Sequence, residues 1–155
     1  MKFCVKKSGK TTNEILKGLT DLEKNKLQVG HFSDQGYHPT AKDDANNRMT
    51  YVDLMRYHHN GNESVYPRPV IDILSTIRAP SLDSGRYKRY LQQWTKEIPT
   101  IQNNKALLEG FGKNLVEDEQ NIFGDTSVLE LGSNPTPLID TGELKKAVTY
   151  KIKEG

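Results

Sequence analysis

Residues 134–144 read NPTPLIDTGEL, and this stretch fixes how the chain approaches its last strand. Its two prolines set their own φ and push the residues before them into extended geometry. Asp140, Thr141 and Gly142 then predict a structural turn, in which a side-chain oxygen caps the short helical turn that follows. Residues 149–152 alternate in polarity as a closing strand. The sequence therefore predicts an extended segment, a turn and a strand, in that order.

An Asp-Thr-Gly triplet also supplies the catalytic carboxylate of aspartic proteases. That chemistry needs two carboxylates that share a proton, and this chain contains one such triplet. A homodimer would provide the second carboxylate, as in retroviral enzymes, but those enzymes carry the triplet near the amino end. We therefore favour the structural turn and keep an aspartic-type protease as an alternative.

The composition is that of a single domain over residues 1–155. Leu, Ile, Val and Phe make up about 23% of the chain, slightly above the roughly 20% below which chains tend to be disordered. A folded chain with so little apolar material often completes its burial against partners. With 22 basic and 20 acidic residues the net charge is +2, so no overall field indicates nucleic-acid binding.

The lone cysteine, Cys4, has no companion for a disulfide or a metal site, which fits assembly in a reducing cytoplasm. No apolar run approaches the roughly 18 residues of a membrane span, and the first residues lack the apolar stretch of a signal peptide. We expect neither a membrane anchor nor secretion by these routes.

Hydrophobic periodicity predicts an α+β fold. Helical spacing of apolar residues occurs over residues 12–24, 51–59, 71–77, 84–98 and 100–122. Residues 26–32 alternate as a short strand, which we expect to pair either with residues 3–6 or with the closing strand. The result is a small, mainly antiparallel sheet packed against helices, with long loops available for assembly.

Two segments are candidates for contact with other subunits. Residues 33–47 contain no aliphatic residue larger than Ala and predict a long loop, which includes Tyr37 and His38. Such a loop suggests an arm that a neighbouring subunit orders, with a mobile insertion of no function as the alternative.

The second candidate is the tetrapeptide Tyr66, Pro67, Arg68 and Pro69. A guanidinium held between two prolines is pre-aimed at little conformational cost and suits a bidentate contact to a carboxylate. We expect these four residues to lie at a subunit or partner interface. Pairing of Arg68 within its own subunit is the alternative.

Other patterns carry weaker signals. Tyr87, Tyr90 and Trp94 share one helical face, which core packing explains better than stacking on bases, although interleaved basic residues keep contact with DNA as an alternative. His58 and His59 resemble the histidines of His-Asn-His nucleases, without their opening strand or cysteine pairs.

Catalytic and ligand-binding motifs are lacking. The spacing of the histidines (31, 38, 58 and 59) matches no metal pattern, and neither a phosphate-binding loop nor a nucleophile elbow occurs. We expect no catalytic residue, no metal and no cofactor.

Four motifs occur in a recognisable order: QVGHF at 28–32, a helix that ends in Asn60-Gly61-Asn62, YPRPVI at 66–71 and PLIDTG at 137–142. This order resembles the tail-completion and virion-morphogenesis proteins of long-tailed bacteriophages, a head-tail joining family that includes tail-terminator-like proteins. The resemblance covers nearly the whole chain. The chain departs from the family at the His58-His59-Asn60 triplet and at Val70, where an acidic-aromatic pair and an aromatic residue are more common.

The resemblance implies a structural virion protein of the phage neck and not an enzyme. Such a protein forms a homo-oligomeric ring, with a hexamer favoured, that completes the tail and joins it to the head connector as terminator or adaptor. Its partners would be copies of itself, the connector or stopper, the tail tube and genomic DNA that passes through the lumen without sequence recognition. It would assemble in the host cytoplasm. The alternatives are a small phage nuclease, an aspartic-type protease or a nucleic-acid-binding module.

Overall fold

A computed structural model describes residues 12–63, 66–76, 85–97, 101–125, 127, 129 and 142–155. The helices are α1 (Thr12–Lys24), α2 (Tyr51–Asn60), α3 (Val70–Thr76), α4 (Gly85–Glu97), α5 (Ile101–Ile122) and α6 (Glu143–Lys146). The strands are β1 (Lys26–Gly30), β2 (Tyr37–Lys42), β3 (Arg48–Thr50) and β4 (Thr149–Lys153), and η1 (Ser33–Gln35) is a 3-10 turn. The α+β fold class expected from the sequence is confirmed.

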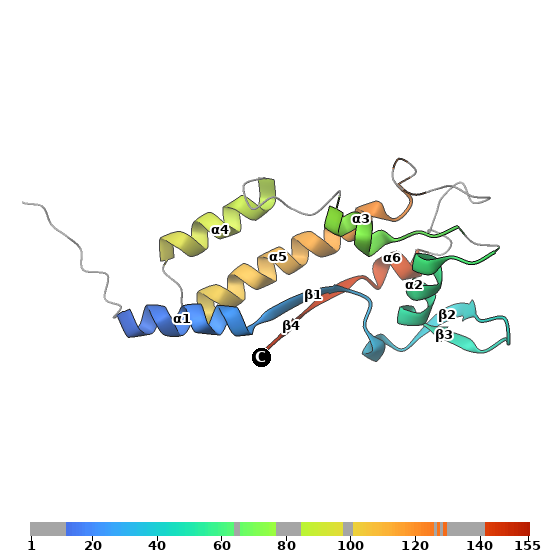
Figure 1. The fold of residues 1–155 in the computed structure, drawn as a ribbon, viewed down its shortest axis with the longest axis horizontal. Coiled ribbons are helices and arrows are strands. Elements are labelled where there is room, and N and C mark those ends of the chain that lie inside the picture. Colours follow the sequence, from blue (N-terminus) through green and yellow to red (C-terminus); the bar gives the residue numbers. More distant parts are fainter. Residues whose placement is uncertain are drawn as a thin grey trace, which may run out of the picture.

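The long helix α5 is the centre of an elongated molecule (Figure 1). It packs against α1, α3 and α4 and against the ribbon that β1 and β4 form. Helices α2, α3 and α6 and the hairpin of β2 and β3 gather towards one end of the molecule, and α1 lies at the other. Within the described ranges, no helix combines the length and the apolar character needed to cross a membrane.

The β1–β4 ribbon is antiparallel and has two chemically different faces. Leu27 pairs with Ile152 and Val29 with Tyr150, so these side chains share the face that packs on α5. The opposite face carries three lysines, and in its register Lys26 pairs with Lys153 and Gln28 with Lys151. Of the two partners expected for the strand at residues 26–32, the closing strand is therefore confirmed.

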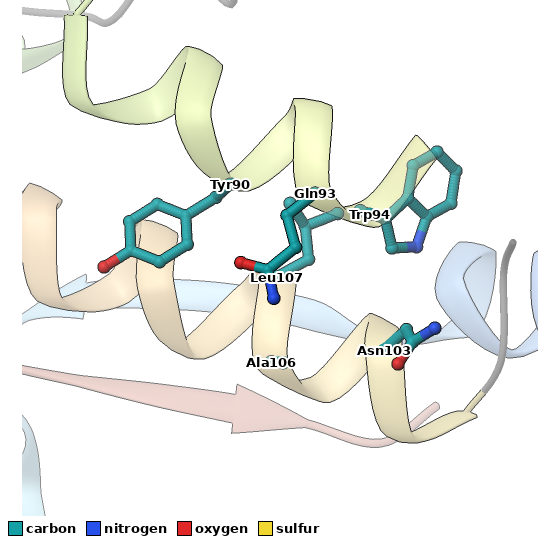
Figure 2. A pocket seen from close by; sticks show the side chains of 6 residues that line it. All are labelled: Tyr90, Gln93, Trp94, Asn103, Ala106 and Leu107. Atoms are coloured by element: carbon teal, nitrogen blue, oxygen red, sulfur yellow. The ribbon is translucent and has the colours of Figure 1, made fainter. Parts of the chain in front are cut away.

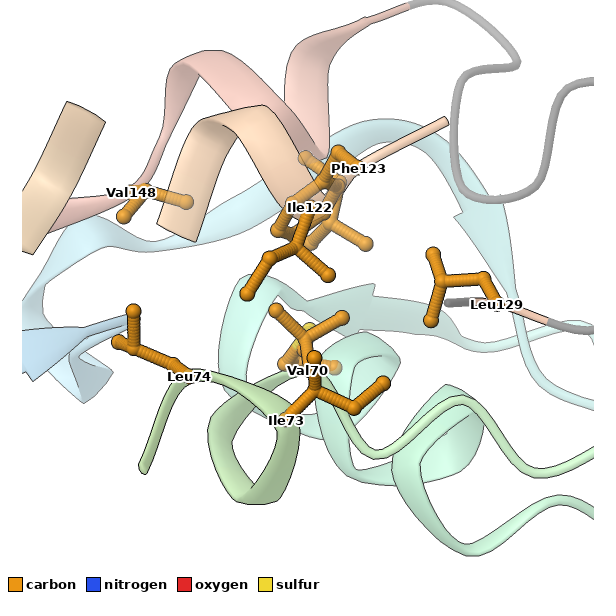
Figure 3. Close-up of a cluster of buried hydrophobic side chains, with 9 residues drawn as sticks. Val70, Ile73, Leu74, Ile122, Phe123, Leu129 and Val148 are labelled. Carbon is orange, nitrogen blue, oxygen red and sulfur yellow. The ribbon is translucent and has the colours of Figure 1, made fainter. Parts of the chain in front are cut away.

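The hydrophobic core lies where α2, α3 and α6 meet the end of α5 (Figure 3). Val70 and Ile122 are fully buried at its centre. The remaining members are Met55, Ile73, Leu74, Phe123, Leu129, Leu144 and Val148. Burial of one such aliphatic side chain stabilises the fold by roughly 1.5–3 kcal/mol.

A polar junction ties α1 and α4 to α5 at the other end. The fully buried Asn104 donates from Nδ2 to the carbonyl of Gly18, at 2.6 Å, and to Asp21 Oδ2, at 3.0 Å. Its Oδ1 accepts a hydrogen bond from Trp94 Nε1 at 2.8 Å. One amide thus joins three helices with its hydrogen-bonding capacity used, as a buried polar group requires.

Local signals explain the bounds of α2. The Thr50 hydroxyl accepts a hydrogen bond from the backbone N–H of Asp53 at 3.1 Å and caps the helix start. At the other end Gly61 has φ 64°, and its N–H donates to the carbonyl of Tyr57 at 3.0 Å. The positive φ expected at this glycine is confirmed.

The loop expected over residues 33–47 is wrong, because η1, β2 and the turn into β3 occupy it. Asp43 closes this turn by accepting hydrogen bonds from the N–H of Asn47, at 2.7 Å, and from its Nδ2, at 3.1 Å. Asn46 takes the left-handed conformation with φ 65°. The hairpin lacks a hydrophobic pattern because it stands away from the core: His38 is the one residue of β2 that is buried.

Gly112 allows the ribbon to approach α5. A Cβ at this position would overlap the ring of Tyr150. We expect Gly112→Ala to lower the free energy of unfolding by about 1–3 kcal/mol, as overpacking does. The loss would occur although Ala is the better helix former by about 1 kcal/mol.

Urea denaturation in the Tyr150→Ala background provides the control. Without the ring, Gly112→Ala should be neutral or stabilising by up to about 1 kcal/mol. An equal destabilisation in both backgrounds would mean that the contact between ring and glycine does not determine the helix–ribbon distance.

Candidate functional site

The expected interface residues divide into exposed and buried groups. Tyr37 and Tyr66 are 56% and 55% exposed, and Pro67 is also exposed. His38 and Arg68 are each 6% exposed and lie inside their own subunit. A contact role for these two side chains is therefore corrected, because a buried side chain presents no surface to a neighbour. Pro69 is half-buried.

Arg68 has a position inside the subunit, beside α2. Its backbone N–H donates to the carbonyl of His58 at 2.7 Å, and its own carbonyl accepts from the N–H of Val70 at 2.8 Å. Burial, together with the nearby Arg68 charge, lowers the pKa of His58 to about 4. The two prolines thus direct the guanidinium into the interior, as the alternative interpretation expected.

His38 supports the hairpin from within. Its Nδ1 accepts hydrogen bonds from the N–H groups of Thr40, at 3.3 Å, and Ala41, at 3.0 Å. Its ring lies edge-on to Tyr51, with 5.4 Å between the ring centroids. These contacts hold β2 against α2, so that Tyr37 on the same strand points outward.

A groove of about 210 Å³ lies between β1, α2 and α3. One face of α2 supplies Val52, Met55, Arg56 and His59, and the other walls are Val29, Gly30, His31 and Ile71. Small-molecule sites usually measure about 300–1,000 Å³, so the size of the groove suits a side chain better than a cofactor. Its charged rim is internally paired: Arg56 with Asp53 at 3.4 Å, and His59 with Asp72 at 3.5 Å.

Glu119 lies behind this groove and is fully buried on α5. Neither of its carboxylate oxygens has a hydrogen-bond partner within the part of the chain that the structure describes. A Cβ built on Gly30 would be 4.0 Å from both oxygens and 3.7 Å from Cδ1 of Ile71. Desolvation raises the pKa of Glu119 to about 7. Such a group is a recognised marker of functional sites.

A second polar group with an unused atom lines the groove. The Nε2 of His31 lies 2.7 Å from the carbonyl of Leu144, and because a carbonyl only accepts, this nitrogen carries the proton. Nδ1 is then an acceptor, and it is buried without a hydrogen-bond partner among the described residues. Burial also lowers the pKa of His31, so the ring stays neutral at physiological pH.

The helical spacing on α5 contains a signal for Glu119 that the sequence analysis missed. Leu115 precedes it by four residues and Ile122 follows it by three, so Glu119 occupies the apolar stripe of the helix. A carboxylate in that register indicates a buried charge. The chemical identity of the residue alone suggested a solvated position.

The turn at Asp140, Thr141 and Gly142 is partly visible. Asp140 and Thr141 fall outside the described residues. Gly142 has φ 76°, and its carbonyl accepts from the N–H of Lys146 at 3.0 Å as α6 begins. The positive φ expected there is present, and so is the short helical turn after it.

The aromatic face of α4 points into the molecule. Tyr87 is 4% exposed, packs edge-on to Phe111 and donates from its hydroxyl to Asp118 at 2.6 Å. Figure 2 shows Tyr90 and Trp94 on the side of α4 that faces α5, around a pocket of about 80 Å³. Core packing explains these aromatics, and they present no free stacking surface for bases.

No group of three or more potential metal ligands occurs among the residues that the structure describes. Comparison with known proteins adds no assignment, since no family model, curated protein or solved structure matches the chain. The groove and the carboxylate behind it are therefore the candidate functional site on their geometry alone.

Glu119 should make the stability of the fold depend on pH. Below its ordinary pKa of 4.5 the carboxyl is protonated in both folded and unfolded chains. Between pH 4.5 and about 7 the unfolded chain releases the proton first, so the free energy of unfolding falls as pH rises. The full cost, on the order of 3 kcal/mol, applies above about pH 7.

We expect Glu119→Met to be more stable than the wild-type protein at about pH 8, with a smaller difference at about pH 5. Urea denaturation at both pH values measures this. Because the neutral histidines His31 and His58 are present in both proteins, the difference between the two isolates Glu119. A difference that is the same at both pH values would contradict a buried, titrating carboxylate.

Proposed function

We propose that this chain is a structural subunit of a tailed-phage neck, which forms a ring that completes the tail and joins it to the head connector. The resemblance of four ordered motifs to the tail-completion family supports this proposal. The ring is a homo-oligomer, most simply a hexamer that matches a sixfold tail, and DNA passes through its lumen. The function is binding and not turnover.

The observation that carries the proposal is the placement of exposed apolar side chains. A ring needs a head-to-tail interface, so each subunit must present two different patches. Leu16 and Leu19, 56% and 43% exposed, lie on α1 at one end of the molecule. Tyr37, Tyr66 and Ile71 are exposed on β2 and around the start of α3, towards the opposite end. Two separated patches of this kind suit a closed ring of repeated contacts.

A nucleic-acid-binding module is less well supported than a ring subunit. Its best candidate surface was the aromatic face of α4, and that face packs on α5. DNA affinity that falls steeply with salt would favour this alternative. Peptide or DNA cleavage by the purified chain would favour the protease or nuclease alternatives.

Removal of Tyr66 should separate assembly from folding. Because the side chain is 55% exposed, Tyr66→Ala should change the free energy of unfolding by less than about 0.5 kcal/mol. As an aromatic residue in a contact patch it should weaken ring formation by about tenfold or more. Sedimentation velocity over a concentration series measures the assembly, and thermal denaturation measures the fold.

Lys88→Ala, an exposed change on α4 outside both patches, is the matched control and should leave assembly unchanged. A chain that remains monomeric at all concentrations, and that immunolabelling does not find at the neck of the particle, would contradict the proposed function.

A further inference from the structure

The position of Glu119 lowers the stability of the isolated subunit. It lies in the apolar stripe of α5, where Leu or Met would avoid the cost of a buried charge. Truncation of one member of a buried pair is costly because the other charge is left alone, and Glu119 is in that state within the described part of the subunit. A cation that arrives from outside would remove the cost.

Gly30 leaves room for such a cation. A side chain there would stand between the groove and the carboxylate, but the glycine leaves a space whose nearest atoms are Cδ1 of Ile71 and the two Glu119 oxygens, at 3.7–4.0 Å. Ile71 is 37% exposed and ends in a flexible side chain. A group that enters the groove therefore reaches the carboxylate when the end of Ile71 moves aside.

We infer that the groove between β1, α2 and α3 receives Lys17 from α1 of a second copy of the chain, and that the lysine ammonium pairs with Glu119. This inference rests on the ring assembly proposed above. It names one pair of elements that meet at the head-to-tail contact.

The chemistry of the two surfaces supports this choice of occupant. Lys17 is exposed and stands in sequence between Leu16 and Leu19, the two exposed leucines of α1. A lysine stem is apolar and its head is charged, which matches a groove with apolar walls and a carboxylate at its base. The basic groups of the rim, Arg56 and His59, already have acidic partners in their own subunit, so the unpaired charge is that of Glu119.

Paired variants test the contact. Glu119→Gln removes the charge with little change in shape, and Lys17→Met removes the ammonium from an exposed position. Each should raise the dissociation constant between subunits by about tenfold or more, measured by sedimentation velocity. The double variant should be no weaker than the weaker single variant by more than about threefold, because both changes remove one interaction.

Two controls keep the result specific. Glu109→Gln on α5 and Lys24→Met on α1 remove like charges from the same helices and should leave the dissociation constant unchanged. Should Glu119→Gln fail to fold, Glu119→Met takes its place, because an apolar side chain suits the stripe of α5.

Unchanged dissociation constants in both single variants would overturn the pairing and leave ring assembly intact. Additive losses in the double variant would place the two side chains in separate contacts and would also overturn it. A wild-type chain that remains monomeric would overturn both this inference and the proposed function.

Discussion

The close approach of α5 to the β1–β4 ribbon is the constraint on which the rest of the structure depends. Tyr150 lies over Gly112, so a 22-residue helix runs along two strands with no side chain between. The strands come from distant parts of the sequence, and this contact aligns them along one axis. The core at one end and the Asn104 junction at the other then attach the remaining helices to that axis.

Periodicity in the sequence was sufficient for the helices, because α1, α2 and α5 each bury a regular stripe. It was insufficient for β2 and β3, since a hairpin that stands in solvent needs no alternating pattern and is held by Asp43, Asn47 and His38. Arg68 and Glu119 were misplaced or missed for a common reason. Their chemical identity suggested the surface, whereas the surrounding fold buries both. Local sequence does not report such tertiary burial.

Polar burial is concentrated on one side of the molecule. His31, His58, Arg68 and Glu119 all lie near α2, β1 or the end of α5, in a region where a small domain would otherwise accumulate aliphatic contacts. Natural proteins retain such groups where stability is exchanged for a specific role. The helical end, in which Asn104 satisfies each of its hydrogen bonds, has the opposite character. The two ends therefore differ in how much of their stability depends on what binds them.

The lysine-bearing face of the ribbon has a consequence for solubility. Like charges directly opposite one another on neighbouring strands repel, and Lys26 faces Lys153 in this way. Two-stranded ribbons have exposed edges that invite pairing with other chains, and lysines are a common protection against it. Subunits crowded together would resist sheet-to-sheet stacking through this face, and rising ionic strength would weaken that protection by screening the charges.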